Sequence, residues 1–471
     1  MPRQYTPDGA PSNIPLPLGG EGKVRGGANA LRPSLDGATL SGSTQWRSKQ
    51  VGWGGMAKRR AAMPSPGEAG GFCRSMPAPS AWACHPPGAP LASSCVPILA
   101  LLWLVSFVLA ADVANAPDPQ SVHDSITRAV AFLVQDQNSD GSWGGPQDSI
   151  TTWSGEMWPN PETHRAWKVA TTGLCVAALL EVGPPPEAAD ATDRAVQYLL
   201  HNADVKRPNE WDLMNNWAYI YGLQGLAAAA GHPRYAAPAI HEQIAAAVPK
   251  YFDALAHFQS VDGGWGYLAF DVPRTQRPQW STSFMTAAAV VAMEDAKRQG
   301  FIVDQAVIDR AVRLVQRCRL PNGAYSYHAR VIPNLHSEYI DQVKGSLSRI
   351  QVCQAALLAA GRDVPLEDRR FGLTHFFREH KFLDIAMHKP VPHEAYYYNS
   401  GYFYLFGHYY AGLVIATLPP EEQAQWWPKL CREILKTQQE DGSMWDYDVH
   451  RYDRPYGVAF SLLALHRSLT P

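Results

Sequence analysis

The sequence has neither a strong excess of one charge nor a run of basic residues. Its 41 Lys and Arg residues nearly balance 43 Asp and Glu residues, so the formal net charge at pH 7 is −2. Proteins that bind nucleic acid usually carry blocks of positive charge. The composition therefore argues against a nucleic-acid partner.

Cysteine is also sparse, and no two cysteines have the Cys-x-x-Cys spacing. That spacing marks zinc knuckles and redox pairs, so neither is indicated. Three of the seven cysteines fall in the first 95 residues, and the other four, Cys175, Cys318, Cys353 and Cys431, are isolated within helical stretches. We expect those four to be buried as small apolar residues. Whether any of them pair stays open.

The amino-terminal part lacks an apolar run long enough to span a membrane. Residues 97–110 are apolar, but these 14 residues fall short of the ~20 that a spanning helix needs. A run of this length that ends in Val108-Leu109-Ala110 is typical of a signal peptide. We therefore expect the protein to be exported to the periplasm or the outside of the cell after cleavage. Without cleavage, residues 96–111 would tether it to a membrane, the one membrane contact expected.

The first 95 residues lack apolar periodicity and are rich in Gly, Pro, Ser and Arg, so we expect disorder there. Since nearly 100 residues before a signal peptide are abnormal, we expect the natural start at Met56, which basic residues follow, or at Met76. The predicted organisation is a disordered segment at 1–95 that is not necessarily translated, a signal-peptide core at 96–111 and one large domain at 112–471.

What the chain does contain is a short turn sequence that recurs. It is Gln-Asn-Ser-Asp-Gly-Ser-Trp at 137–143 and Gln-Ser-Val-Asp-Gly-Gly-Trp at 259–265, and it returns with one more residue before the Trp at 438–445. A weaker copy, Pro-Asn-Gly-Ala-Tyr, lies at 321–325. The turn positions 140, 262, 322 and 441 are 122, 60 and 119 residues apart, which are multiples of about 60. Six such units fill residues 112–471, with eroded copies expected near 201 and 381.

Each unit combines two kinds of helix. The first kind is apolar on one face, as at residues 307–315. The second kind follows the turn and is apolar on nearly all sides, which is typical of a buried helix. Segments of the second kind are 171–180, 223–230, 285–293, 351–360, 411–417 and 458–465. Six buried helices inside six amphipathic ones predict an all-α protein, an α6/α6 toroid built from six helical hairpins.

The recurring turns resemble the QW-type repeats of the terpenoid cyclase and protein prenyltransferase superfamily, whose squalene–hopene cyclases carry Gln-x-x-Asp-Gly-x-Trp. The resemblance covers roughly residues 120–469. It implies the α/α toroid, a ring that also hosts polysaccharide lyases, glycosidases and non-enzymatic domains, so it does not fix the reaction. We expect the Gln and Trp of each turn to join that turn to its neighbour.

The segments after the turns lead into the inner helices, so we expect them to line one mouth of a central cavity, the usual place for a ligand. These segments are both aromatic and rich in ionisable residues. The candidate catalytic residues are His393, His408, Asp446, Asp448, Asp453 and Glu338, and the candidate ligand-binding residues are Trp158, Trp217, Arg274, Trp280, Tyr327, Tyr398, Tyr402 and Arg454.

A polar and aromatic mouth predicts a hydrated, extended ligand, such as a polysaccharide. Aromatic rings stack on the apolar faces of sugars, while charged groups bind hydroxyls and carboxylates. A lyase would use a base such as His393 or His408, with Arg454 to stabilise the enolate. A hydrolase would use a carboxylate pair such as Asp446 and Asp448.

Two alternatives stay open. A squalene-type cyclase needs a strong acid, which the family supplies as Asp-x-Asp-Asp, and this chain has only Asp446-Tyr-Asp448 with Asp453 five residues on. The basic residues at 450–454 are expected to lower the pKa of these carboxylates. The other alternative is a non-catalytic toroid that binds a ligand or a protein. The zinc-dependent prenyltransferase reaction is rejected, because no mouth segment contains a cysteine.

The histidines leave a metal cofactor open without clearly implying one. His328, His336, His388, His393, His408 and His450 all fall in the last three mouth segments. Three of them, with Glu338 or Glu394, would suffice for a metal site. Their spacing in the sequence is not diagnostic of one.

Amino-terminal sequencing of the native protein checks the predicted start. Residues that precede Met56 should be absent, and the chain should begin close after Ala110 where the signal peptide has been removed. Recovery of a peptide that precedes Met56 would contradict this prediction.

Overall fold

The computed structural model describes residues 116–147, 161–183, 185–205, 215–267, 281–329 and 339–470. The chain divides into one unit at residues 1–90 and another at 91–471, and every described residue belongs to the second. Within the described ranges, no helix has the length and apolar character needed to cross a membrane. The predicted segments at 1–95 and 96–111 lie outside these ranges, so their limits stay predictions.

Six helices of the described chain form an outer layer. They are α2 (Pro119–Asp136), α5 (Pro186–His201), α7 (Pro238–Phe258), α9 (Gln305–Arg317), α11 (Leu366–Arg378) and α14 (Pro420–Leu435). Each is buried mainly along one face. In α9, for example, Val307, Ile308, Ala311 and Val315 are buried while Arg313 and Gln316 are exposed. This is the one-sided pattern that the sequence predicts for the outer helices.

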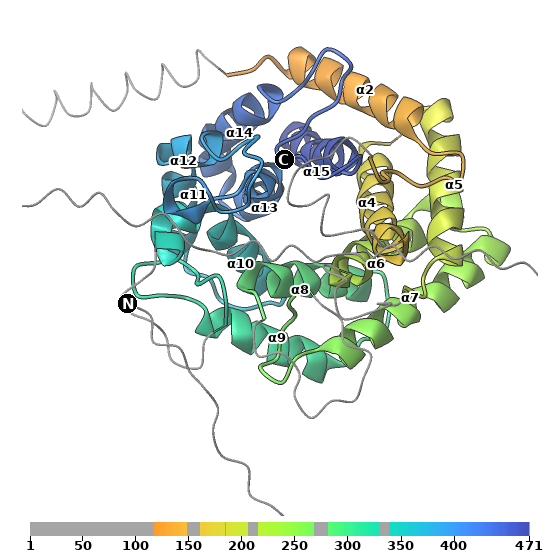
Figure 1. Ribbon diagram of the computed structural model, residues 1–471, viewed down its shortest axis with the longest axis horizontal. Coiled ribbons are helices and arrows are strands. Elements are labelled where there is room, and N and C mark those ends of the chain that lie inside the picture. Colours follow the sequence, from red (N-terminus) through yellow and green to blue (C-terminus); the bar gives the residue numbers. More distant parts are fainter. Residues whose placement is uncertain are drawn as a thin grey trace, which may run out of the picture. The chain divides into compact units, whose positions relative to one another are not determined.

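Six further helices lie inside the first six. They are α4 (Pro161–Val182), α6 (Asn216–Gly231), α8 (Ser283–Arg298), α10 (Leu347–Ala359), α13 (Tyr404–Ile415) and α15 (Asp453–Leu469). Each contacts the next in chain order, and α15 contacts α4, so the inner layer closes on itself (Figure 1). The predicted all-α architecture, an α6/α6 toroid of six helical hairpins, is confirmed.

The connection between α11 and α13 lacks the Asp-Gly or Asn-Gly turn seen after α2, α7, α9 and α14. It contains α12 (Lys381–Asp384), η4 (Tyr396–Tyr398) and η5 (Gly401–Phe403). The sequence predicts an eroded turn near residue 381, but the structure has a connection that contains these short helices instead. The short helices η2 (Tyr339–Asp341) and η3 (Val343–Gly345) contact η4 from the preceding hairpin, and η1 (Pro233–Tyr235) follows α6.

In three of the turns, a Gln holds the turn against the next outer helix. Gln259 Nε2 donates to the carbonyl oxygens of Gly263, at 2.8 Å, and of Val307 in α9, at 2.9 Å. Its Oε1 accepts from Arg310 Nε at 2.7 Å. Gly263 has a φ of 100°, and a Cβ there would lie 2.7 Å from the Arg310 carbonyl oxygen. The turn and the next helix therefore approach too closely for any residue except glycine.

The same arrangement recurs at two other turns. Gln137 Nε2 donates to the carbonyl oxygen of Ala191 in α5 at 2.7 Å, and Gln438 Nε2 donates to that of Ser125 in α2 at 2.9 Å. Because α2 is the first described helix and Gln438 belongs to the last turn, this bond joins the two ends of the ring. The expected role of the Gln, to connect a turn to its neighbour, is seen directly in these contacts.

The Trp of the turn bonds to its own hairpin. Trp143 and Trp265 are fully buried, and their indole nitrogens donate to backbone carbonyls of α2 and α7 at 2.8 and 2.9 Å. In the last turn Met444 takes the buried place, and Trp445 stacks on His388 with ring centroids 3.8 Å apart. The sequence suggests that Trp445 is equivalent to Trp143 and Trp265, but the equivalent position is that of Met444, one residue earlier.

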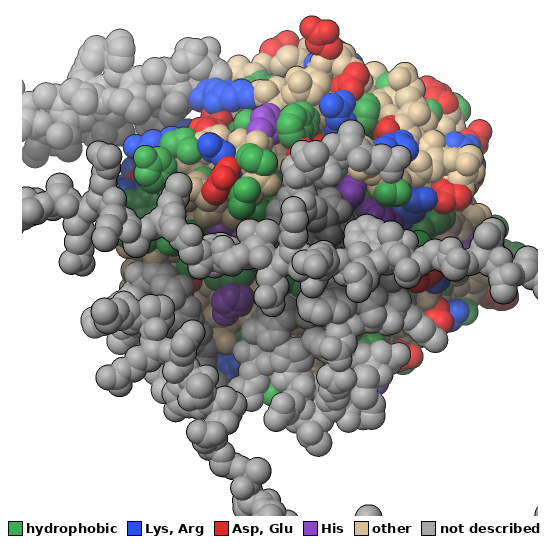
Figure 2. All heavy atoms as spheres, in the orientation of Figure 1, with side chains coloured by type: hydrophobic (Ala, Val, Ile, Leu, Met, Phe, Trp, Pro, Cys, Tyr) green, Lys and Arg blue, Asp and Glu red, His purple; other side chains and the backbone are tan. Residues whose placement is uncertain are grey.

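Ion pairs link neighbouring outer helices at the surface. Arg370 of α11 donates to Glu422 of α14 at 2.8 Å, and Arg319 donates to Asp368 of α11 at 2.8 Å. Figure 2 shows acidic and basic side chains interspersed on the described part of one face. Exposed pairs of this kind contribute about 0–1 kcal/mol each, so the core and the turn bonds dominate the stability of the ring.

The four cysteines of the described chain are free and buried. Burial raises the pKa of the Cys175 and Cys353 thiols well above the ordinary value. They act as small apolar residues of the inner layer, as predicted.

Replacing Gln259 with Met should lower the free energy of unfolding by roughly 2–4 kcal/mol, because two buried carbonyls and Arg310 lose their partner while the side-chain volume is kept. Urea unfolding at pH 7 measures the change. The exposed Gln316→Met on α9 is the matched control, with an expected change under about 0.5 kcal/mol. Equal losses in the two variants would contradict the role assigned to Gln259.

Candidate functional site

The inner helices enclose a cavity of about 380 Å³, within the range of ~300–1,000 Å³ typical of small-molecule sites. We call it the aromatic chamber. Its lining comes from α4, α6, α8, α13, α15 and the loops between them, and the described lining contains no Asp, Glu, Lys or Arg. Its aromatic members are Trp167, Trp217, Tyr221, Tyr267, Phe284, Tyr327, Tyr402, Phe403, Phe406, Tyr447, Tyr456 and Phe460.

The rings of the chamber wall hold one another in place. Trp217 and Tyr221, one helical turn apart on α6, stack with centroids 5.3 Å apart and planes 5° apart. Phe284 of α8 meets Phe403 edge to face at 5.1 Å and Tyr327 at 5.2 Å. Such pairs add about 0.5–1.5 kcal/mol beyond the burial of their area. The chamber wall is therefore a well-packed apolar surface, and the faces of several rings are turned towards the cavity.

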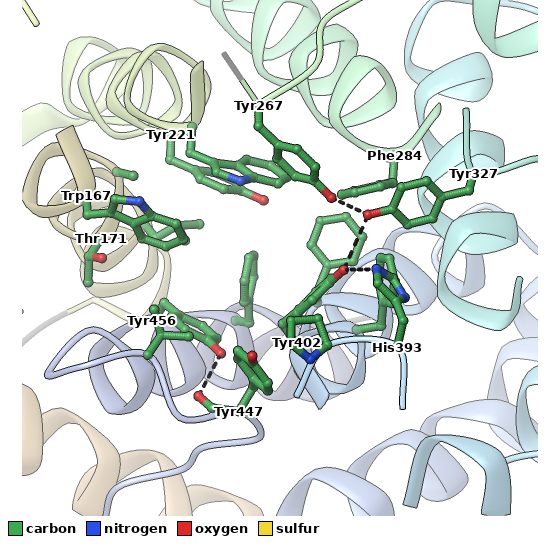
Figure 3. A pocket seen from close by; sticks show the side chains of 18 of the residues that line it. Trp167, Thr171, Tyr221, Tyr267, Phe284, Tyr327, His393, Tyr402, Tyr447 and Tyr456 are labelled. Carbon is green, nitrogen blue, oxygen red and sulfur yellow. Dashed lines mark hydrogen bonds between the residues drawn. The ribbon is translucent and has the colours of Figure 1, made fainter. Parts of the chain in front are cut away.

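A chain of hydrogen bonds crosses one wall of the chamber (Figure 3). The hydroxyls of Tyr267 and Tyr327 are bonded to each other, and those of Tyr327 and Tyr402 are 3.4 Å apart. The Tyr402 hydroxyl lies 3.0 Å from His393 Nε2. Burial raises the pKa of all three phenols well above the ordinary value. The hydroxyls therefore stay protonated and bond in series towards His393.

His393 has a defined tautomer. Its Nδ1 lies 2.7 Å from the carbonyl oxygen of Tyr398, and a carbonyl only accepts, so Nδ1 carries the proton. Nε2 is then the acceptor for the Tyr402 hydroxyl. Burial lowers the pKa of His393, which keeps the imidazole neutral. The imidazole is neutral, and its unprotonated nitrogen accepts a hydrogen bond from a hydroxyl. This is the arrangement of a general base.

The backbone that presents His393 is strained. His388, His393, Tyr397 and Tyr398 have φ values of 63°, 63°, 59° and 54°, and none is glycine. Residues in this region cost of order 1–3 kcal/mol each and persist only where the surroundings hold them. Four of the five such residues in the described chain belong to this segment. Strain of this kind tends to gather at functional sites, which favours a role for the segment in ligand binding.

Arg349 lies buried behind the same wall. Its guanidinium carbon is 5.4 Å from the ring centre of Tyr327 and 5.8 Å from that of Phe403, and its Nε donates to the Tyr325 carbonyl at 3.2 Å. Burial lowers the pKa of Arg349, although the group stays a cation. This charge favours negative charge on the nearby phenol oxygens.

Asp446 lies on the opposite side, behind Tyr456. Its carboxyl accepts from the Tyr456 hydroxyl at 2.7 Å and from the Leu405 backbone nitrogen at 2.8 Å. Burial raises the pKa of Asp446 to about 7. Burial also raises the pKa of Asp453 to about 7. Both carboxyls are thus partly protonated at neutral pH.

The expectation that basic neighbours lower these pKa values is wrong. Arg454 lies 3.1 Å from Asp441, and Arg451 lies 3.6 Å from Asp136, so both guanidinium groups are paired elsewhere. Desolvation then decides the pKa of Asp446 and of Asp453, with Arg454 only partly offsetting it at Asp453.

A second, polar cleft of about 370 Å³ lies at the carboxyl-terminal turn. We call it the polar cleft. It is lined by Asp448, Asp453, Arg451, Arg454 and neighbouring residues. Asp448, Asp453 and Arg454 are therefore brought together as the sequence suggests, but away from the lining of the aromatic chamber.

Two further candidates, His408 and Tyr398, do not line the chamber. His408 is fully buried against Phe376 and His380, on the side of α13 that faces the outer layer. Its expected place in the cavity mouth is therefore wrong. Tyr398 is 47% exposed, and only its backbone carbonyl takes part, as the acceptor for His393.

The remaining candidates either line the chamber or lie outside the described residues. Trp217, Tyr327, Tyr402 and His393 all line the chamber, although nothing here tests a role for any of them. Four others lie outside the described residues, namely Glu338, Trp158, Arg274 and Trp280. Of the six histidines considered for a metal, His328 and His393 line the chamber, and His336 also lies outside the described residues.

Several chamber residues escaped the sequence analysis. Phe284, Phe406 and Phe460 lie within or next to apolar helices, where they are indistinguishable from ordinary core residues. The sequence marks Arg349 only weakly, as a single basic residue just before the apolar segment 351–360.

The chain matches no protein-family model and no curated protein. Similar solved structures include a type II terpene cyclase from Scytonema, with 14% identity and a TM-score of 0.43, over 74% of this chain and 99% of that one. An inactive variant of an α-1,6-mannanase of Salegentibacter, in complex with α-1,6-mannotetrose, has 10% identity and a TM-score of 0.44, over 75% and 100%. A possible GH105 member from Klebsiella pneumoniae has 14% identity and a TM-score of 0.46, over 75% of this chain and 94% of that one.

At such identities and scores, the ligands of those proteins carry no argument about this chain.

The buried carboxyl of Asp446 should make the protein less stable as the pH rises. Its folded pKa is about 7 against 3.8 for an ordinary Asp, so between these values the folded state holds a proton that the unfolded state has released. The free energy of unfolding then falls with a limiting slope of about 1.4 kcal/mol per pH unit. Urea unfolding from pH 4 to 7 measures it.

Asp446→Asn imitates the protonated acid and should remove the contribution of Asp446 to this slope, while Asp453, whose folded pKa is also about 7, keeps its own. Asp253→Asn, which changes an exposed residue of α7, is the control and should leave the slope as it is in the wild type. A slope that survives Asp446→Asn unchanged would refute the assignment.

Proposed function

We propose that the aromatic chamber binds an apolar, isoprenoid-type molecule with one polar group, and that the protein performs proton transfer on that group. The observation that carries this proposal is the described lining itself, which is built of rings and contains no charged side chain. A chamber of this kind gains its binding energy from apolar area, at about 25 cal/mol per Å². A sugar would leave its hydroxyls without partners there.

The Tyr402–His393 pair supplies one of two proton-transfer groups. His393 Nε2 accepts from the Tyr402 hydroxyl, so when that hydroxyl passes its proton to Nε2, the phenol oxygen can take a proton from a ligand. Arg349, 5.4 Å from the Tyr327 ring, favours the negative charge that develops on the phenol oxygens meanwhile. The pair therefore acts as a base, with Tyr402 as the group that touches the ligand.

Asp446 supplies the second group through Tyr456, which lines the chamber. When Asp446 is protonated, its O–H can donate to the Tyr456 oxygen, and Tyr456 then passes its own hydroxyl proton to the ligand. With a pKa of about 7, Asp446 still carries a proton at neutral pH, but it is a weak acid. Such an acid is too weak for an unactivated alkene, yet it suits a carbonyl, epoxide or alcohol oxygen. This favours proton transfer at an oxygen-bearing carbon over the alkene protonation of a squalene-type cyclase.

The polar cleft supports a second candidate. Asp448, Asp453, Arg451 and Arg454 all line this cleft, so a hydrated sugar chain fits it better than it fits the chamber. The polysaccharide hypothesis drawn from the sequence therefore belongs to the polar cleft.

Export remains part of the proposal. It rests on the apolar residues 97–110 and the Val108-Leu109-Ala110 pattern alone.

The test compares farnesol, its hydrocarbon counterpart farnesene, and neutral and acidic polysaccharides, by tryptophan fluorescence and thermal unfolding. Farnesol and farnesene should both bind, and a ligand at 100 times its dissociation constant should stabilise the fold by about 2.7 kcal/mol. Binding of polysaccharides alone would overturn the chamber proposal in favour of the polar cleft.

Tyr402→Phe separates the polar contact from the apolar one. It removes only a hydroxyl, so it should weaken farnesol binding roughly 5-fold, as expected for one hydrogen bond of about 1 kcal/mol, and leave farnesene unchanged. Tyr396→Phe, in the same segment but 69% exposed, is the matched control and should change neither. If Tyr402→Phe weakens both ligands alike, or neither, the role of Tyr402 is wrong.

A further inference from the structure

Three side chains with metal-ligating atoms converge where α12 meets α14. His380 directly precedes α12, Asp384 ends it, and Glu433 lies on α14. His380 Nδ1 is 3.0 Å from Asp384 Oδ1 and 3.6 Å from Glu433 Oε2, and the three ligand atoms lie within 4.8 Å of one another. None of the three residues lines the aromatic chamber, so this cluster is independent of the proposed function.

The proton on the neighbouring His408 is fixed by its contacts. His408 Nδ1 lies 2.7 Å from the Tyr404 carbonyl oxygen, which only accepts, so this nitrogen carries the proton. In a neutral His408, Nε2 is then a bare acceptor. That atom lies 3.1 Å from His380 Nε2, which must therefore donate.

The second nitrogen of His380 then faces two carboxylates. In a neutral His380 whose proton is on Nε2, Nδ1 is a lone pair directed at Asp384 and Glu433. His380 is 6% exposed, and although Asp384 Oδ1 is 3.0 Å away, Nδ1 makes no hydrogen bond within the described residues. The carboxylate thus lies off the axis that an N–H would need. A cation between His380 Nδ1 and the two carboxylates, either a proton on that nitrogen or a metal ion, removes the repulsion between these lone pairs.

The spacing suits a metal ion. Around a tetrahedral ion with bonds of roughly 2.0–2.1 Å, neighbouring ligand atoms are ~3.3 Å apart. The measured 3.0 and 3.6 Å lie on either side of that value. An imidazole nitrogen with two carboxylates favours zinc and similar transition metals over calcium or magnesium, which prefer oxygen ligands only. We propose that His380, Asp384 and Glu433 bind a divalent transition metal of the zinc class, with water as the remaining ligand.

His408 acts as a positioning residue for this site. Metal-bound histidines usually donate their second N–H to an acceptor that fixes the ring, and here His380 donates to His408, which in turn donates to the Tyr404 carbonyl. This relay holds His380 Nδ1 towards the two carboxylates. The buried His408, which does not line the chamber, thereby orients a ligand of the metal site.

One cation already competes for the site. Lys436 Nζ lies 2.5 Å from Glu433 Oε2, the same oxygen that faces His380. Its side chain is 55% exposed, so it can swing into solvent when a metal binds. Removing this ammonium group should therefore tighten metal binding, an outcome that an ordinary surface ion pair would not produce.

Isothermal titration of the metal-free full chain with Zn²⁺ tests the proposal, with Co²⁺ as a spectroscopic probe of the ligand number. We expect one ion per chain, visible absorption typical of four-coordinate Co²⁺, and at least a 10-fold loss of affinity in each of Asp384→Asn and Glu433→Gln. His408→Gln should weaken binding 10- to 100-fold. Lys436→Ala should strengthen it.

His375→Gln, which changes a half-buried histidine of α11 outside the cluster, is the control and should bind as the wild type does. Far-ultraviolet circular dichroism of each variant establishes that it is folded. Absence of Zn²⁺ binding in the folded wild-type chain would overturn the proposal and leave a protonated His380 between the carboxylates. Binding that survives Asp384→Asn and Glu433→Gln unchanged would overturn it equally.

Discussion

The structure depends on the bond between the Gln of one turn and the outer helix of the next hairpin. At Gln259 a single side chain satisfies the carbonyl of its own turn and a carbonyl of α9, and it accepts from Arg310 of that helix. An isolated helical hairpin cannot bury its apolar inner helix, so each unit needs a neighbour at a fixed distance. The Gln sets that distance, because its three bonds leave little freedom to tilt or slide. The closed inner layer and the cavity inside it follow from this repeated contact.

The same contacts determine where chemistry is placed. Each turn leads into an inner helix, and the first half of that helix carries rings such as Trp217 and Phe284 into the chamber. The connection between α11 and α13, which lacks the Asp-Gly turn, brings His393 to the chamber wall and His380 to α14. A segment that lacks the regular turn is thus the part in which this ring has most freedom to acquire polar groups.

The ring was predictable from the sequence because its cause is local and repeated. The period of about 60 residues and the apolar helices after each turn specify six hairpins without knowledge of any tertiary contact. The site was harder, since it depends on direction and solvation. His408 and Tyr402 belong to the same stretch of sequence, yet one faces outward and the other into the chamber. The pKa of Asp453 could not be inferred from its basic neighbours, because the partners that neutralise them come from elsewhere in the chain.

The bond between Gln438 and Ser125 joins residues that are 313 positions apart. Helix α2, the first described helix, contacts α14 and α15, which leave the ribosome last. During synthesis the apolar face of α2, with Val122 and Leu133, must therefore wait for nearly the whole chain before it is covered. A ring closed end to end cannot complete its folding from one end as it emerges, so the nascent chain depends on chaperones, or on a slow final step, more than an open array of the same hairpins would.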